Sequence, residues 1–142
     1  MAGQIEKVGV TMNSFSNPDT VHAPLGKYHH NVSVPGASEW LVISGQVGRD
    51  REGNVPPSVK EQAELVFRNV LACLEAGGMG KADLVKLTTY LTDARFVGDY
   101  RAARAAVIGD DTLPASTLVI VAGLAAPEFL IEVEAWAAKA SS

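Results

Sequence analysis

The chain has 142 residues, of which 47% are hydrophobic and 20% are charged, and its formal net charge is -4 at pH 7. This length suits one domain with a single core, and the composition excludes a disordered chain. Lys and Arg are scattered and form no basic stripe, so a nucleic acid is not an expected partner. We therefore expect a single domain over residues 1–142.

The compartment is predicted from one cysteine and from the N-terminus. Cys73 is the only cysteine, so the chain forms no intramolecular disulfide, which fits a reducing cytoplasm. Cys73 lies within a helical apolar pattern, which predicts a buried and inert thiol. The first eight residues, MAGQIEKV, hold no apolar signal core, and no apolar run approaches the length of a membrane span. We predict a cytoplasmic protein with no membrane partner.

The N-terminal third is predicted to contain short strands. A first strand is expected at residues 8–12, before a long irregular segment. Two further strands are expected at residues 31–34 and 40–44, because Pro-Gly and small polar residues at 35–38 favour a turn between them. The two strands together predict a β-hairpin. Residues 45–57 are predicted to be a loop, because they contain three glycines and two prolines.

The clearest helix is predicted at residues 58–76. Ser58 and Glu61 form an S-x-x-E capping box, and Gly77-Gly78 ends the helix. Apolar residues recur at three- and four-residue steps and form one stripe, which consists of Ala63, Val66, Phe67, Val70, Leu71 and Leu74. This stripe needs an apolar partner, most simply the face of a sheet.

The second half of the chain predicts a strand, a helix and two further strands. The strand covers residues 84–92, and the helix covers 93–107 with Asp93 as its cap. The last two strands are expected at residues 117–122 and 129–137. Strands therefore dominate both ends of the chain, with two helices between them. This pattern predicts an α+β fold with both helices on one face of a mixed β-sheet.

The last strand holds the strongest candidate site. Side chains alternate along a strand, so the apolar residues at odd positions from 129 to 137 face the core. The other face carries two carboxylates between two large apolar side chains: Leu130, Glu132, Glu134 and Trp136. Either solvent surrounds these glutamates, or another subunit covers them. Under such a cover, desolvation would raise the pKa of a glutamate, which could then exchange protons near neutral pH.

Other residues give weaker signals for chemistry. Ser44-Gly45-Gln46 offers a hydroxyl, an open backbone and an amide at the end of a strand, and a simple turn is the alternative. His29 and His30 are adjacent and point in different directions on an extended chain. No H-E-x-x-H motif or Cys/His cluster is present, so we expect no metal and no other cofactor.

Five short segments follow one another in a fixed order between about residues 26 and 137: Gly26-Lys27-Tyr28, Ile43-Ser44-Gly45-Gln46, Leu74-Glu75-Ala76-Gly77-Gly78, Pro114-Ala115-Ser116-Thr117 and Ile131-Glu132-Val133-Glu134-Ala135. Together they resemble the RidA/YjgF family of enamine and imine deaminases. Four of them resemble the family's G-P-Y, T-S-G-Q, P-A-R-S/T and V-E-I-E-A. The order and spacing of the segments carry the assignment.

The resemblance implies a chorismate-mutase-like subunit in a homotrimer. The three sheets would form an inner barrel, with active sites in the clefts between subunits. A small molecule would bind there, and water would attack the imine carbon while ammonia leaves. The resemblance implies that Glu132 is the catalytic residue that holds and activates the water. It also implies a set of substrate-binding positions, namely Tyr28, Ser44, Gly45, Ser116 and Thr117.

Ser116 is the main departure from the family. Active members have an arginine at this position, which binds the substrate carboxylate. Serine offers one hydroxyl and no charge, and losing the guanidinium should cost about 2–4 kcal/mol of transition-state binding. The sequence therefore predicts a divergent deaminase or hydrolase of a small enamine, imine or related metabolite, rather than of the usual amino-acid-derived imine.

Two other functions and one question about the pocket stay open at this point. The trimer could bind a small metabolite without chemistry, or it could be an aminomuconate-type deaminase of aromatic catabolism. Three arginines could replace the missing cation from another direction, although a surface position is the simpler interpretation for each: Arg49, Arg101 and Arg104.

Overall fold

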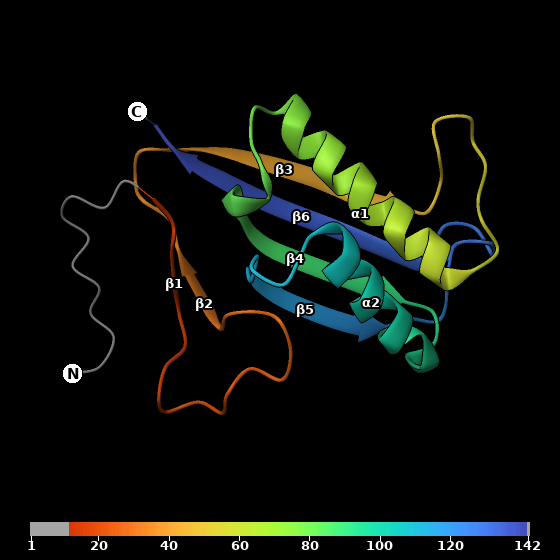
Figure 1. Cartoon of the computed structure of the whole chain (residues 1–142), viewed down its shortest axis with the longest axis horizontal. Coiled ribbons are helices and arrows are strands. Elements are labelled where there is room, and N and C mark those ends of the chain that lie inside the picture. Colours follow the sequence, from red (N-terminus) through yellow and green to blue (C-terminus); the bar gives the residue numbers. More distant parts are fainter. Residues whose placement is uncertain (1–11, 142) are drawn as a thin grey trace.

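The computed structural model describes residues 12–141, and the strand predicted at residues 8–12 lies outside them but for Met12. A four-stranded sheet forms one layer and two helices form the other (Figure 1). The strand order is β3 (Ser38–Val47), β6 (Ile131–Ala140), β4 (Leu84–Leu91) and β5 (Ala115–Ile120). β6 pairs antiparallel with both of its neighbours, whereas β4 and β5 are parallel. The predicted α+β fold with a mixed sheet is confirmed.

Both predicted helices are present and begin at the predicted caps. In α1 (Val59–Ala76), the Ser58 hydroxyl accepts a hydrogen bond from the Glu61 amide at 3.3 Å. The second helix is divided into a 3-10 turn, η2 (Ala94–Phe96), and α2 (Val97–Val107). The Asp93 carboxylate caps the turn, because it accepts a hydrogen bond from the Arg95 amide at 2.8 Å. Another 3-10 turn, η1 (Lys81–Asp83), leads into β4.

The core lies between α1 and the centre of the sheet. Val66, Phe67 and Val70 of the predicted stripe are fully buried, whereas Leu71 is half-buried and packs against the core edge. The odd-numbered residues of β6 from 131 to 137 are also fully buried. Cys73 is half-buried rather than buried.

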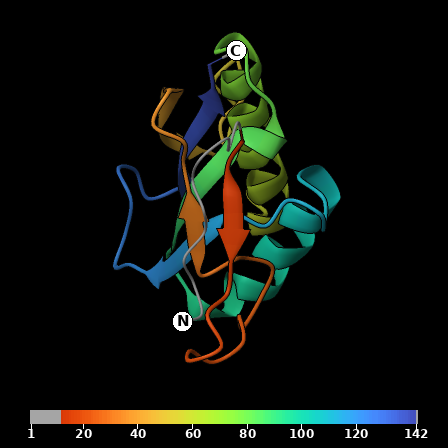
Figure 2. The ribbon, with the colours of Figure 1, turned by 90° about the vertical axis from the view of Figure 1, so that its left-hand side faces the viewer.

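The predicted β-hairpin is wrong. β2 (Asn31–Ser33) pairs with β1 (Ser14–Ser16) in a small separate sheet, and β1 falls in the segment predicted to be irregular (Figure 2). β3 instead pairs along most of its length with β6. This pairing places Leu41 and Ile43 against the core. A three-residue partner such as β2 could not satisfy the backbone of a ten-residue strand.

β3 also continues through residues 45–47, which the sequence analysis assigned to a loop. Ile43 pairs with Ala135 and Gln46 pairs with Val133, so β3 carries one extra residue between these two pairs. This arrangement is a β-bulge, which bends the strand and redirects its side chains. The bulge brings Ser44 and Gly45 next to the face of β6 that carries Glu132.

Candidate functional site

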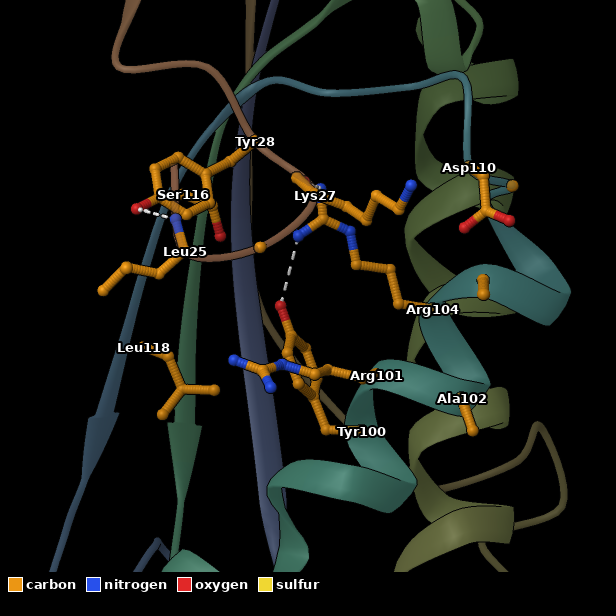
Figure 3. A pocket seen from close by; sticks show the side chains of 13 residues that line it. Leu25, Lys27, Tyr28, Tyr100, Arg101, Ala102, Arg104, Asp110, Ser116 and Leu118 are labelled. Atoms are coloured by element: carbon orange, nitrogen blue, oxygen red, sulfur yellow. Dashed lines mark hydrogen bonds between the residues drawn. The ribbon is translucent and has the colours of Figure 1, made fainter. Parts of the chain in front are cut away.

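A pocket of about 450 Å³ lies between the N-terminal segment at residues 25–28, helix α2 and strand β5 (Figure 3). It joins two predicted binding positions that are far apart in sequence, Tyr28 and Ser116. Ser116 faces the helix side of the sheet because it is level with Leu87 of β4, whose side chain is fully buried there. The pocket therefore lies on the helix-covered side of the sheet.

The segment that carries Tyr28 is held against the chain just before β5. The amide of His29 donates to the carbonyl oxygen of Pro114 at 3.2 Å, and Nδ1 of His29 lies 2.6 Å from the carbonyl oxygen of Leu113. The Tyr28 hydroxyl accepts a hydrogen bond from the Leu25 amide at 3.0 Å. These contacts fix Tyr28 beside the P-A-S-T segment that contains Ser116.

Two of the three arginines left open by the sequence lie in this pocket. Arg101 and Arg104 project from α2 (Figure 3). Arg101 is exposed, but Arg104 is only 7% exposed and is therefore not a surface arginine. Arg49 lies in the loop after β3, where its guanidinium approaches Gly53, and it does not line the pocket.

The remaining predicted residues lie on the opposite face of the sheet. A Cβ atom at Gly45 would lie 2.0 Å from Oε2 of Glu132, so only glycine lets this carboxylate approach the bulge so closely. Ser44 is exposed beside Gly45. Thr117 is exposed on the same face, where its hydroxyl accepts a hydrogen bond from Nζ of Lys86 at 2.6 Å. Within a single chain, the predicted site residues therefore form two groups, one on each face of the sheet.

The two glutamates of β6 have different surroundings. The Tyr90 hydroxyl donates to Oε1 of Glu134 at 2.5 Å. This hydrogen bond raises the pKa of Tyr90 above 10.0, and partial burial and the charges of Glu134 and Glu132 add to the shift. Within residues 12–141, the Glu132 side chain has no hydrogen-bond or ion-pair partner, which leaves its carboxylate open to water or a ligand. The sequence analysis did not identify Tyr90, although the alternation of β4 places it on this face.

The same face of the sheet carries exposed apolar side chains. Trp40, Val42 and Trp136 are 51%, 58% and 44% exposed. The rings of Trp40 and Trp136 pack edge to face with their centroids 6.1 Å apart. The exposed position of Trp136, opposite the buried odd-numbered residues, agrees with the predicted alternation of β6. An apolar patch of this kind is typical of a surface that binds another protein chain.

Gln62 ties the loops around the bulge to α1, a role that the sequence did not indicate. Its Nε2 donates to the carbonyl oxygens of Pro56 and Glu128 at 2.8 and 2.9 Å, and its Oε1 accepts from the Leu130 amide at 3.0 Å. Gln62 is fully buried. A Cβ atom at Gly48 would lie only 2.5 Å from that of Gln62, so the chain after β3 passes directly over this side chain.

The described histidines are engaged by backbone carbonyl groups or neighbouring rings. Nε2 of His30 lies 2.7 Å from the carbonyl oxygen of His22, and the two rings pack edge to face. Among residues 12–141, no three His, Cys, Asp or Glu side chains gather closely enough to hold a metal ion. In the same range, no helix has both the length and the apolar character that a bilayer crossing requires.

Two helices packed on one face of a mixed four-stranded sheet define a small α+β protein, and this arrangement agrees with the RidA type. A family model described as Endoribonuclease L-PSP matches residues 20–139. The chain belongs to this family, the RidA/YjgF family that the sequence motifs predicted.

Individual relatives agree with this assignment. The chain is 32% identical over 120 residues to the 2-iminobutanoate/2-iminopropanoate deaminase of Escherichia coli. This match covers 82% of this chain and 91% of the E. coli protein. It is 41% identical over 73 residues to a RutC family protein of Aquifex aeolicus, a match that spans 51% of this chain and only 56% of that protein. The crystal structure of the Rid family protein YyfB from Yersinia pestis, described as of unknown function, superposes with a TM-score of 0.79 at 28% identity. That superposition covers 88% of this chain and 97% of the Yersinia chain.

Proposed function

We propose that this protein hydrolyses a small enamine or imine to a carbonyl compound and ammonia, in clefts between the subunits of a homotrimer. One observation carries the proposal: Glu132 presents a carboxylate without a partner among residues 12–141, set against the glycine bulge of β3. The family and the 32% identity to the E. coli deaminase support the same chemistry.

The positions of the two residue groups favour an assembly in which each site uses two subunits. β3 and β5 are the two edge strands of the sheet, and they carry Ser44 and Ser116 respectively. If the β3 edge of one subunit meets the β5 edge of the next, the contact is head-to-tail, and such contacts form a ring when the rotation between subunits closes. The β5 edge that carries Ser116 would then lie next to the β3 edge of the neighbouring subunit, where Gly45 contacts Glu132. The same ring would cover the exposed Trp40 and Trp136, and the resemblance to the family sets the number of subunits at three.

Glu132 accounts for the proton transfers that imine hydrolysis needs. As a water oxygen attacks the imine carbon, the Glu132 carboxylate accepts one proton of that water. It returns this proton to the nitrogen, which gives a carbinolamine. The carboxylate then passes the proton of the new hydroxyl group to the same nitrogen, and the carbon–nitrogen bond breaks to leave a carbonyl group and ammonia. The Ser44 and Tyr28 hydroxyl groups are suited to hold the substrate through neutral hydrogen bonds.

Ser116 makes the substrate preference differ from that of the E. coli relative. Without an arginine on β5, we expect imines derived from serine and threonine to be poor substrates. The proposed substrate is therefore an enamine or imine other than those derived from serine and threonine. An aminomuconate-type enamine is one candidate.

The test measures ammonia release from imines generated in situ by an amino acid oxidase, from neutral imines without a carboxylate, and from an aminomuconate-type enamine. We expect acceleration with at least one compound and its loss in Glu132→Gln. Glu75→Gln, which alters an exposed glutamate on α1, is the matched control and should keep full activity. If the protein accelerates ammonia release from none of these compounds, the proposed enzymatic function is refuted. If a compound instead raises the melting temperature and is recovered unchanged, the cleft binds a metabolite without chemistry.

A further inference from the structure

Arg104 of helix α2 is hydrogen-bonded to the segment at residues 25–28. Its Nη2 donates to the carbonyl oxygen of Lys27 at 2.5 Å, and its Nη1 donates to the Tyr100 hydroxyl at 3.4 Å. The guanidinium therefore joins the helix to the N-terminal segment, and the side chain lies between them (Figure 3). Within residues 12–141, no other hydrogen bond links this segment to α2.

The surroundings of Arg104 suit a structural contact. Arg104 is almost fully buried and lies in the last turn of α2. A helix C-terminus carries a partial negative charge, which favours a cation at this position. Both acceptors are neutral oxygens, and a hydrogen bond from a charged donor is roughly twice as strong as one between neutral groups. The position of Arg104 therefore needs no acidic ligand to explain it.

The contact falls on the turn that carries Tyr28. The Tyr28 amide donates to the carbonyl oxygen of Gly26 at 3.0 Å, which makes a three-residue turn centred on Lys27. The Tyr28 hydroxyl accepts a hydrogen bond from the Leu25 amide at 3.0 Å, so its own proton stays available to a ligand. The turn and this hydrogen bond lock the tyrosine onto its own segment.

Two anchors fix this segment beside the pocket. On one side, His29 contacts the backbone at residues 113–114, just before β5. On the other side, Arg104 ties Lys27 to α2. Tyr28 lies between the two anchors in the chain, and α2 and β5 form two walls of the pocket. Without the Arg104 anchor, the segment would be free to rotate about the other one and carry the Tyr28 hydroxyl away from the pocket.

We propose that Arg104 is a positioning residue, which acts on the substrate only through Tyr28. This inference rests on the proposed function, because it concerns a residue that holds the substrate in the same cleft. The guanidinium contacts the N-terminal segment and not the substrate, so Arg104 should matter equally for charged and neutral compounds. Its effect should appear in KM rather than in kcat, because Tyr28 holds the substrate whereas Glu132 transfers the protons.

A double-mutant cycle between Arg104→Met and Tyr28→Phe tests this dependence. Methionine keeps a buried apolar stem and removes both hydrogen bonds. On the compound of the imine panel with the highest kcat/KM, each single substitution should raise KM about fivefold, the effect of one neutral hydrogen bond, and leave kcat within about twofold. The double variant should also raise KM about fivefold, whereas independent effects would multiply to about 25-fold. Arg68→Met alters an exposed arginine of α1 and should keep the wild-type KM.

The fluorine spectrum of the protein labelled with fluorotyrosine tests the same contact without turnover. The chain has three tyrosines, and Tyr28→Phe identifies the resonance of Tyr28. In Arg104→Met, this resonance should move towards its position in the urea-unfolded protein, while that of Tyr90, on the opposite face of the sheet, stays in place. If Arg104→Met does not fold, Arg104→Gln replaces it, because its amide is shorter than the guanidinium and ends before the Lys27 carbonyl.

The outcomes separate this inference from the proposed function. A Tyr28 resonance that stays in place in the Arg104 variant overturns the inference, whether or not any imine is hydrolysed. Effects on KM that multiply in the double variant, or a fall in kcat with an unchanged KM, also overturn it. A displaced Tyr28 resonance without turnover of any compound supports the positioning role of Arg104 and refutes the proposed enzymatic function.

Discussion

Replacing Gly45 with alanine should displace the Glu132 carboxylate without unfolding the protein. The added Cβ would lie 2.0 Å from Oε2 and 2.8 Å from Cδ of Glu132, whereas real Cβ atoms almost never approach a heavy atom closer than 3.0 Å. The carboxylate oxygen must therefore move by about 1 Å, the difference between the first and last of these distances. Because it is the end of a flexible side chain, the displacement should cost at most about 1.5 kcal/mol of rotamer strain.

The effect on catalysis should be far larger than the effect on stability. A displacement of about 1 Å at a reacting group can cost about a hundredfold in rate, so we expect kcat/KM of Gly45→Ala to fall about a hundredfold on the best imine of the panel. Ammonia release gives the rate, and circular dichroism and thermal unfolding report the fold.

The matched control for this substitution is Gly36→Ala. Nothing lies within 4 Å of a Cβ atom at Gly36, and its backbone does not adopt a positive φ. Gly36→Ala should keep the wild-type rate. If Gly45→Ala retains activity within about threefold of the wild type, the placement of Glu132 against the bulge does not control the chemistry and the reasoning fails.

Three further predictions concern stability and titration. Gln62→Leu should lower the free energy of unfolding by about 3 kcal/mol in urea denaturation, because two carbonyl groups and one amide lose a buried partner. The Arg95 guanidinium and amide lower the pKa of Asp93 from 3.8 to about 2, so its stabilising effect is complete above pH 3.8 and is lost as the pH falls towards about 2. The melting temperatures of Asp93→Asn and wild type should therefore differ at pH 5 to 6 and converge near pH 2. Glu134→Gln should lower the pKa of Tyr90 towards 10.0, measured by ultraviolet titration against Tyr90→Phe, and an unchanged titration would contradict the Tyr90–Glu134 hydrogen bond.

Local patterns in the sequence were sufficient for the regular elements from α1 to the end of the sheet. The capping residue Ser58 and the apolar stripe predicted α1 because both signals come from residues within a few turns of one another. The alternation along β6 predicted which face is buried and placed Glu132 and Trp136 on the other face. The motif order also identified the family, since it requires only residue types and spacing.

Strand pairings between residues far apart in the sequence could not be predicted from local patterns. The turn at residues 35–38 favoured a hairpin, but β3 pairs with β6, because this long strand needs a partner of similar length. Turn residues indicate where the chain reverses and do not specify which strand becomes that partner. The bulge at Gly45 follows from this pairing, and so does the approach of Glu132.

The sequence by itself determined the family, the helices and the carboxylate on the last strand. The tertiary structure decided that the predicted site residues fall on two faces of the sheet, and that Arg104 is buried in the wall of the pocket that Ser116 also lines. The Arg104–Lys27 contact joins positions 77 residues apart. Nothing local distinguishes Arg104 from a surface arginine, because its burial depends on how the N-terminal segment crosses α2. The burial of Arg104 is therefore visible only in the folded chain.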